Sequence, residues 1–175
     1  MVDAVLGEAN IALSAVTDIV VGVGPGAFTG LRVGLVTARA LGDALGVPVH
    51  GVVTLDALAL ESGLEEPFAV VTDARRREVF WATYSDAFTR DAGPIVAEPS
   101  DVASQLRGRP VVGANATPFA DLFDDVRDPD LPAAGALARY AHRRLAAGRS
   151  LLPPEPMYLR RPDITPSSGP KSVLA

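Results

Sequence analysis

The sequence contains no cysteine, which excludes a disulfide framework and thiolate chemistry. Its two histidines, His50 and His142, stand far apart, so neither a His-x-x-x-His pair nor a His/Cys cluster offers a metal site. No apolar run reaches the roughly 18 residues of a membrane span, and no basic start followed by an apolar stretch indicates secretion. The net charge of -5 argues against a chain that binds nucleic acid on its own. We therefore expect a cytoplasmic protein with no membrane partner and no metal.

The most informative segment that is present joins an apolar strand to a long helix. Residues 19–23 are rich in β-branched side chains and predict a buried strand, and residues 31–45 have helical periodicity without proline. Glycines in the connection permit a tight turn, and we expect Thr29 to cap the helix. Backbone N–H groups at a helix start favour an anion, so Gly26 and Arg32 are candidate phosphate contacts. A purely structural turn is the alternative, because the lysine of a Walker loop is absent.

Small residues recur every four positions along this helix, at Gly30, Gly34, Ala38, Gly42 and Gly46. A glycine inside a helix costs about 0.5–1 kcal/mol relative to alanine, so a compensating contact is expected. Close approach of another helix is one such contact, and packing inside the helix's own lobe is the alternative.

The remaining elements predict two linked α/β lobes. We expect strands over 47–53, 68–72, 78–85 and 110–112, and helices over 1–9, 55–62, 100–106, 117–123 and 137–147, with Thr54 and Ser100 as N-caps. A break rich in Gly, Glu and Pro divides a first lobe, residues 1–65, from a second, residues 66–161. The tail, residues 162–175, has little to bury, and we predict that it is disordered.

Charged side chains give little sign of catalysis. Asp43, Asp56 and Asp73 stand near helix or strand ends, where capping and solvation explain them. Two arginine clusters, Arg75 to Arg77 and Arg139 with Arg143 and Arg144, are interpreted as solvated faces. Contact with the phosphate backbone of a nucleic acid carried by a partner is the alternative for either cluster. The chain contains no G-x-S-x-G elbow and no nucleophile with a base beside it in the sequence.

Three motifs resemble the bacterial TsaB (YeaZ) family. They are GPGAFTGLRVGLVTARALGDALGVPVHGVVTLDALA at residues 24–59, VTDAR followed by EVFW at 71–81, and PMYLR at 156–160. The resemblance covers about residues 1–161 and implies an α/β, actin/hexokinase/Hsp70-like (ribonuclease H-like) two-lobe fold. Family members usually begin with a strand and a hairpin before a helix like 1–9, so we expect an N-terminally truncated first lobe with an open sheet edge.

The resemblance also implies a function. TsaB-like proteins are non-catalytic scaffold or dimerisation subunits of the complex that forms N6-threonylcarbamoyladenosine next to the anticodon of tRNAs reading codons that begin with adenine. The implied partners are a TsaD-like transferase, which carries the metal and the active site, and a TsaE-like ATPase, with tRNA contacted only indirectly. A homodimer is a further possibility. The alternative function is a nucleotide-dependent enzyme or a peptidase of the same superfamily.

The resemblance further implies that pairing uses helices of the first lobe, over residues 1–9 and 29–45. The predicted interface residues are Val2, Val5, Leu6, Gly30, Leu31, Gly34, Leu35, Ala38 and Gly42. No cofactor is expected on this chain alone. ATP or ADP is expected, if at all, at the junction of the complex, with Arg32 or Arg75 as phosphate contacts.

Overall fold

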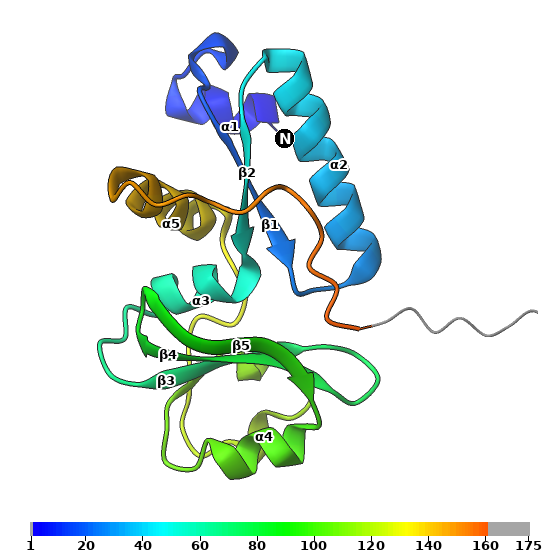
Figure 1. Cartoon of the computed structure of the whole chain (residues 1–175), viewed down its shortest axis with the longest axis vertical. Helices are drawn as coiled ribbons and strands as arrows, with labels where there is room; N and C mark the ends of the chain where they lie inside the picture. The colour runs from blue at the N-terminus through cyan, green and yellow to red at the C-terminus, as the bar shows by residue number, and fades with distance from the viewer. Residues whose placement is uncertain (1, 161–175) are drawn as a thin grey trace, which may run out of the picture.

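The computed structural model describes residues 2–160, and the tail predicted to be disordered lies outside them. Two sheets lie one above the other, with helices on their faces (Figure 1). The helices are α1 Val2–Ala9, α2 Phe28–Leu45, α3 Thr54–Ser62, α4 Pro99–Gln105 and α5 Ala134–Ala146. The strands are β1 Ile19–Gly24, β2 Val49–Val53, β3 Phe68–Asp73, β4 Val79–Asp86, β5 Thr89–Ala97, β6 Val111–Val112 and β7 Val126–Arg127. Three 3-10 turns complete the order, at Leu13–Ala15, Ala114–Ala116 and Ala120–Leu122.

The first sheet is a β-α-β unit in which β1 and β2 run parallel and α2 connects them. Parallel strands need such a crossover, and the apolar side of α2 covers the sheet. Within the described residues β1 pairs only with β2, so no strand lies along its other edge. None of the helices in this part of the chain has the length and hydropathy needed to cross a membrane.

The second sheet has the strand order β5-β4-β3-β6-β7. β3 and β4 form the predicted antiparallel pair, and β4 has a neighbour on each side. The strands β5 and β7 are not among those that the sequence predicts. The sequence also predicts a helix over 117–123, where the structure has only the 3-10 turn Ala120–Leu122.

The main core lies around α3, which sits between the two sheets (Figure 1). Leu55 and Leu58 of α3 are fully buried against Val23 of the first sheet and Phe68 of the second. A second core lies on the other face of the five-stranded sheet, where Val102 of α4 packs with side chains of β3 and β4. Apolar burial of this kind contributes about 25 cal/mol per Å² and holds the two sheets on one helix.

After the second sheet the chain returns to the first. α5 packs Tyr140 and Ala141 against Val52 of β2. The segment 150–160, here called the strap, follows α5, and Leu152 exchanges backbone hydrogen bonds of 2.7 and 3.2 Å with Gly51. The predicted second lobe, residues 66–161, is therefore divided: its last part belongs with β1 and β2. The sequence could not predict this division, because the amphipathic pattern of α5 indicates a buried side but not the sheet on which that side packs.

The predicted side-chain caps are wrong. The N-cap positions of α2, α3 and α4 are Ala27, Val53 and Glu98, none of which makes a side-chain cap hydrogen bond. Thr29, Thr54 and Ser100 instead lie inside the first turns. Val53 is both the last residue of β2 and the N-cap of α3, so the strand passes into the helix without a loop that would place a capping hydroxyl.

Candidate partner interface

One side of α2 faces its own lobe. Leu35, Ala38 and Gly42 are buried there, and Leu31 is half-buried against the same core. A Cβ placed on Gly42 would overlap a methyl of Val49 and lie 3.1 Å from the Val47 carbonyl oxygen, so the backbone of α2 packs directly on the segment leading into β2. Three residues predicted for the partner interface, Leu35, Ala38 and Gly42, are therefore not on the surface. The stripe of small residues four positions apart winds around the helix, so Ala38 and Gly42 fall on its inner side. Leu35 lies on the same side, three positions before Ala38.

The other side of α2 is open. We define the outward face of α2 as Gly30, Val33, Gly34, Val36 and Thr37, all of which are exposed. Nothing lies within 4 Å of a Cβ built on either glycine, and Val33 and Val36 are 62% and 66% exposed. Such valines, next to two glycines, form an apolar strip against which another backbone can pack closely.

α1 adds further apolar side chains to the first lobe. Val2 and Val5 are exposed, and Leu6 is half-buried. These three residues follow the i, i+3, i+4 spacing of one helix side. The structure therefore leaves Val2, Val5, Gly30 and Gly34 accessible, and the partner interface itself stays a prediction.

An exposed arginine-aromatic cluster lies at the start of α2. The Arg32 guanidinium lies 3.9 Å from the Phe28 ring centre and donates a hydrogen bond of 2.7 Å from Nε to the Tyr158 hydroxyl. The rings of Phe28 and Tyr158 lie 5.4 Å apart, centre to centre. Arginine and aromatic side chains held in this way are typical anchors of protein interfaces.

The strap explains the closing motif PMYLR. Its Met157 N–H donates to the Val23 carbonyl at 2.8 Å, which fixes the strap to β1. Its Arg160 forms an ion pair with Glu78 and donates to the Arg75 carbonyl at 3.3 Å, which fixes it to the second sheet. The motif therefore ties the two sheets together.

The three predicted phosphate contacts, Gly26, Arg32 and Arg75, have different surroundings in the structure. Gly26 has no atom near its Cβ position, and Arg32 is held by Tyr158. Arg75 pairs with Asp73 at 3.2 Å and sits in a left-handed turn, with a φ of 60°. Their contact with phosphate stays a prediction. Among the described residues no group of three or more His, Cys, Asp or Glu side chains is placed to hold a metal ion.

Asp56 is a buried acid, which corrects its interpretation as a solvated or capping group. It is 3% exposed and accepts a hydrogen bond of 2.9 Å from the Tyr84 hydroxyl, while Arg90 Nε lies 3.0 Å from the same oxygen. Burial raises the pKa of the Asp56 carboxyl, and the Arg90 guanidinium partly offsets this. Burial near Asp56 also raises the pKa of Tyr140 to about 12, so this phenol stays protonated at neutral pH.

The nearest signal for this cluster in the sequence is the apolar run around Asp56. Leu55, Ala57, Leu58 and Ala59 surround it, which indicates a helix buried on every side. A charged residue inside such a helix requires a partner, but its partners lie in β4, β5 and α5 and could not be named from spacing.

Solved structures share this arrangement of two α/β sheets with connecting helices. An uncharacterized protein from Pseudomonas aeruginosa with similarity to peptidase YEAZ superposes with a TM-score of 0.76, at 31% identity over 91% of this chain and 81% of that one. YeaZ from Pseudomonas aeruginosa gives a TM-score of 0.77, with 31% identity over 91% of this chain and 82% of that one. The fold is thus the actin/hexokinase/Hsp70-like α/β fold of YeaZ, as predicted.

Sequence comparisons agree. The family model described as TsaD: tRNA N6-adenosine threonylcarbamoyltransferase matches residues 1–117. An uncharacterized protein of Mycobacterium leprae (strain TN) is 44% identical over 92% of this chain and 43% of its own length, so this chain spans less than half of that relative. An uncharacterized protein of Mycobacterium tuberculosis (strain ATCC 25618 / H37Rv) is 42% identical over 93% of this chain and 73% of its own. The tRNA threonylcarbamoyladenosine biosynthesis protein TsaB of Escherichia coli (strain K12) is 32% identical over 91% of this chain and 78% of its own. The chain belongs to the TsaB (YeaZ) family.

Proposed function

We propose that this protein is a non-catalytic subunit in the biosynthesis of N6-threonylcarbamoyladenosine on tRNA, and that it pairs with a TsaD-like transferase. Support for the pathway comes from the Escherichia coli relative, whose name assigns it to this biosynthesis, and from the family model, which bears the transferase's name. In this proposal the TsaD-like subunit performs the chemistry. ATP or ADP binds at the junction of the complex, where a TsaE-like ATPase also acts.

The observation that carries the pairing is the outward face of α2. Full burial of a valine contributes about 1.5–3 kcal/mol, so covering Val33 and Val36 is a substantial part of a stable interface. The open space at Gly30 and Gly34 permits a second helix to approach at backbone distance. The buried small residues of α2, Ala38 and Gly42, pack inside the first lobe and are not available to a partner.

A helix of the second sheet provides a matched control. Gln105 is exposed at the end of α4, which packs on the second sheet away from α2 (Figure 1). Gly34→Leu and Gln105→Leu introduce the same side chain at an exposed helical position. Only the first puts it on the outward face of α2.

The test mixes each variant with a purified TsaD-like subunit and measures complex formation by size exclusion with light scattering. We expect Gly34→Leu to abolish the one-to-one complex while the variant stays folded, because its Cβ meets nothing and leucine favours the helix by about 0.8 kcal/mol. Gln105→Leu should pair like the wild type. Normal pairing by Gly34→Leu would refute the assignment of this face. A homodimer of the chain alone that Gly34→Leu disrupts would show that copies of the chain compete for the same face.

A substitution at Ala38 is not a usable test. Ala38 is buried inside its own lobe, so a tryptophan there would overpack the core and destabilise the first sheet. Loss of pairing by such a variant would report on folding and not on the interface.

A further inference from the structure

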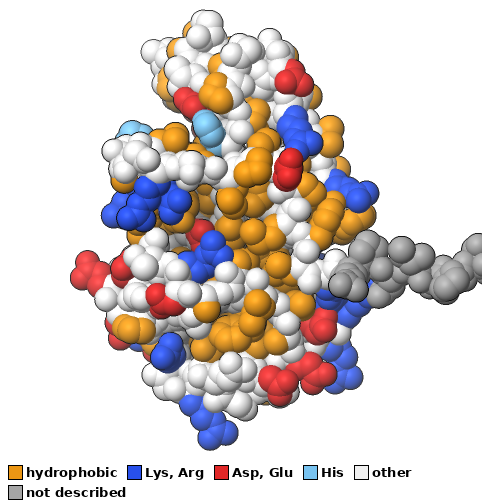
Figure 2. Space-filling view, in the orientation of Figure 1, with side chains coloured by type: hydrophobic (Ala, Val, Ile, Leu, Met, Phe, Trp, Pro, Cys, Tyr) orange, Lys and Arg blue, Asp and Glu red, His pale blue; other side chains and the backbone are white. Residues whose placement is uncertain are grey.

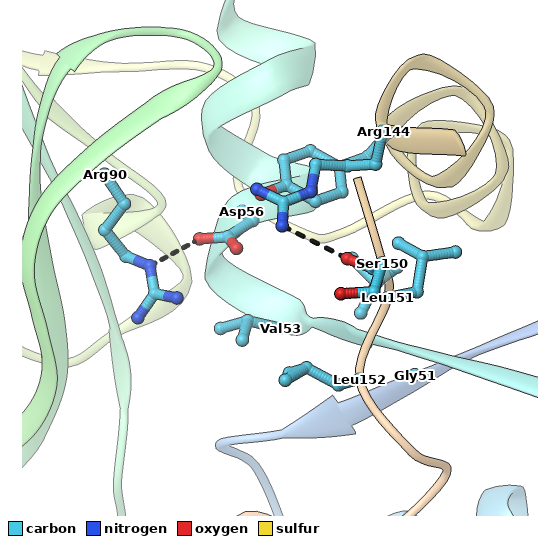
Figure 3. A pocket seen from close by; sticks show the side chains of 10 residues that line it. Gly51, Val53, Asp56, Arg90, Arg144, Ser150, Leu151 and Leu152 are labelled. Atoms are coloured by element: carbon cyan, nitrogen blue, oxygen red, sulfur yellow. Dashed lines mark hydrogen bonds and ion pairs between the residues drawn. The ribbon is translucent and has the colours of Figure 1, made fainter. Parts of the chain in front are cut away.

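A cavity of about 180 Å³ lies at the junction of β2, α3, β5, α5 and the strap. It is far larger than the roughly 30 Å³ that one water occupies. Asp56 forms part of its wall, and Figure 3 shows Arg90 and Arg144 reaching toward this carboxylate from opposite sides. The cavity belongs to different elements from the outward face of α2, so its role is independent of the proposed pairing.

The charges in this cavity do not balance. One carboxylate, Asp56, meets two guanidinium groups, Arg90 and Arg144. The other arginines of α5 are engaged elsewhere: Arg139 lies 3.8 Å from Glu61, and Arg143 lies over the ring of Phe88 at 4.5 Å. Arginines gather on this part of the surface, over α5 (Figure 2). The cluster therefore carries one surplus positive charge beside a partly enclosed space.

Hydrogen-bond donors are in surplus too. Each guanidinium has five N–H groups and no acceptor. Among the bonds of the described residues, Arg90 donates to the Gly93 carbonyl and Arg144 donates to the Ser150 carbonyl at 3.1 Å. Arg90 Nε is fully buried and makes no aligned hydrogen bond, although it lies close to Asp56. The Asp56 oxygen that it approaches already accepts from Tyr84.

A bound group that carries negative charge and hydrogen-bond acceptors would balance the surplus positive charge and accept from the unused N–H donors. Guanidinium groups bind carboxylate and phosphate oxygens through paired, charge-assisted hydrogen bonds, which are stronger than bonds between neutral groups. We propose that this cavity is a binding site for a small oxyanion, a phosphate or a carboxylate, held between Arg90 and Arg144. The backbone of the strap forms one wall, so a bound anion stabilises the contact between the strap and β2.

The test is calorimetric titration of the full chain with inorganic phosphate and, separately, with acetate, in a cationic buffer near neutral pH with sodium chloride at matched ionic strength. We expect saturable one-site binding in the millimolar range or tighter, together with a rise in the melting temperature on saturation. Tighter binding of phosphate assigns the site to a phosphate group, and tighter binding of acetate assigns it to a carboxylate. Adenosine monophosphate serves as a third titrant: binding as tight as that of phosphate indicates a phosphate carried on a larger molecule.

Three variants locate the site. Arg144→Gln should weaken binding about tenfold or more, since it removes a charge-assisted contact but leaves the pair of Arg90 with Asp56 in place. Arg139→Gln, on the same helix but directed to Glu61, should bind like the wild type. Arg90→Gln should also lose binding, and circular dichroism checks that it folds. Absence of saturable binding by the wild type, or unchanged affinity in Arg144→Gln, would overturn the proposal.

Discussion

Two glycines of one helix should respond in opposite directions to the same substitution. Gly34 has nothing within 4 Å of its Cβ position, whereas a Cβ on Gly42 would overlap a Val49 methyl and crowd the Val47 carbonyl. Both are interior positions of α2, so the intrinsic change from glycine to alanine is shared. The pair Gly34→Ala and Gly42→Ala therefore separates helix propensity from packing.

The expected magnitudes follow from these contacts. Alanine favours a helix over glycine by about 0.8–1 kcal/mol, so Gly34→Ala should raise the free energy of unfolding by about that amount. Gly42→Ala gains the same term but suffers overpacking, which costs about 1–3 kcal/mol. The stiff, β-branched Val49 cannot easily rotate away. The difference between the two variants should therefore be about 1–3 kcal/mol, or at least 2 °C in melting temperature for a chain of this size.

Urea denaturation followed by two probes measures these values. Far-ultraviolet circular dichroism reports on both sheets, while fluorescence reports on the single tryptophan, Trp81, in the second core. If the two transitions coincide, the sheets unfold together and one free energy describes both. If Gly42→Ala stabilises the protein as much as Gly34→Ala does, the close packing of α2 on the approach to β2 is refuted.

Three further predictions concern the strap and the buried acid. Gly51→Ala should destabilise the protein by about 1–3 kcal/mol, because the new Cβ would lie 2.5 Å from both the Pro153 carbonyl oxygen and a Val23 methyl. Hydrogen exchange at the Leu152 amide should become faster in this variant, and an unchanged exchange rate would count against the contact. Burial raises the pKa of Asp56 above 3.8, so the folded chain keeps this proton to higher pH than the unfolded chain, and its contribution to stability falls as pH rises above that value. The stability of the wild type minus that of Asp56→Asn, from urea titrations at several pH values, should therefore decrease with rising pH, and a constant or growing difference would contradict the assignment. Arg160→Gln should lower the free energy of unfolding by at most about 1 kcal/mol, since the ion pair of Arg160 with Glu78 is partly exposed. Hydrogen exchange at the Met157 amide should nevertheless become faster, and full protection of this amide would show that Arg160 does not hold the strap.

The sequence predicted the parts of the fold that depend on local pattern. The strand, turn and helix around α2 and the hairpin of β3 and β4 were found because apolar periodicity and glycine placement are local signals. β5 was missed because Gly93 and Pro94 interrupt its middle, and only an edge strand tolerates a proline there.

The candidate sites depended more on tertiary packing. The four-residue spacing from Gly30 to Gly42 is evident in the sequence, but only the structure shows that the stripe passes from the surface to the interior between Gly34 and Ala38. Asp56 was misjudged because its partners come from three other elements, far away in the chain. The cap predicted at Thr54 is wrong because the last residue of β2, Val53, is itself the N-cap of α3.

The strap has a consequence for synthesis. Gly51 of β2 emerges from the ribosome about a hundred residues before Leu152, with which it pairs. At roughly 5–20 residues per second, the nascent first sheet waits on the order of ten seconds for α5 and the strap to cover it. Such high contact order delays folding of the first sheet, whereas the hairpin of β3 and β4 can form as soon as it emerges. Vectorial folding should thus begin in the middle of the chain, and the N-terminal sheet should be the part that most needs a chaperone during translation.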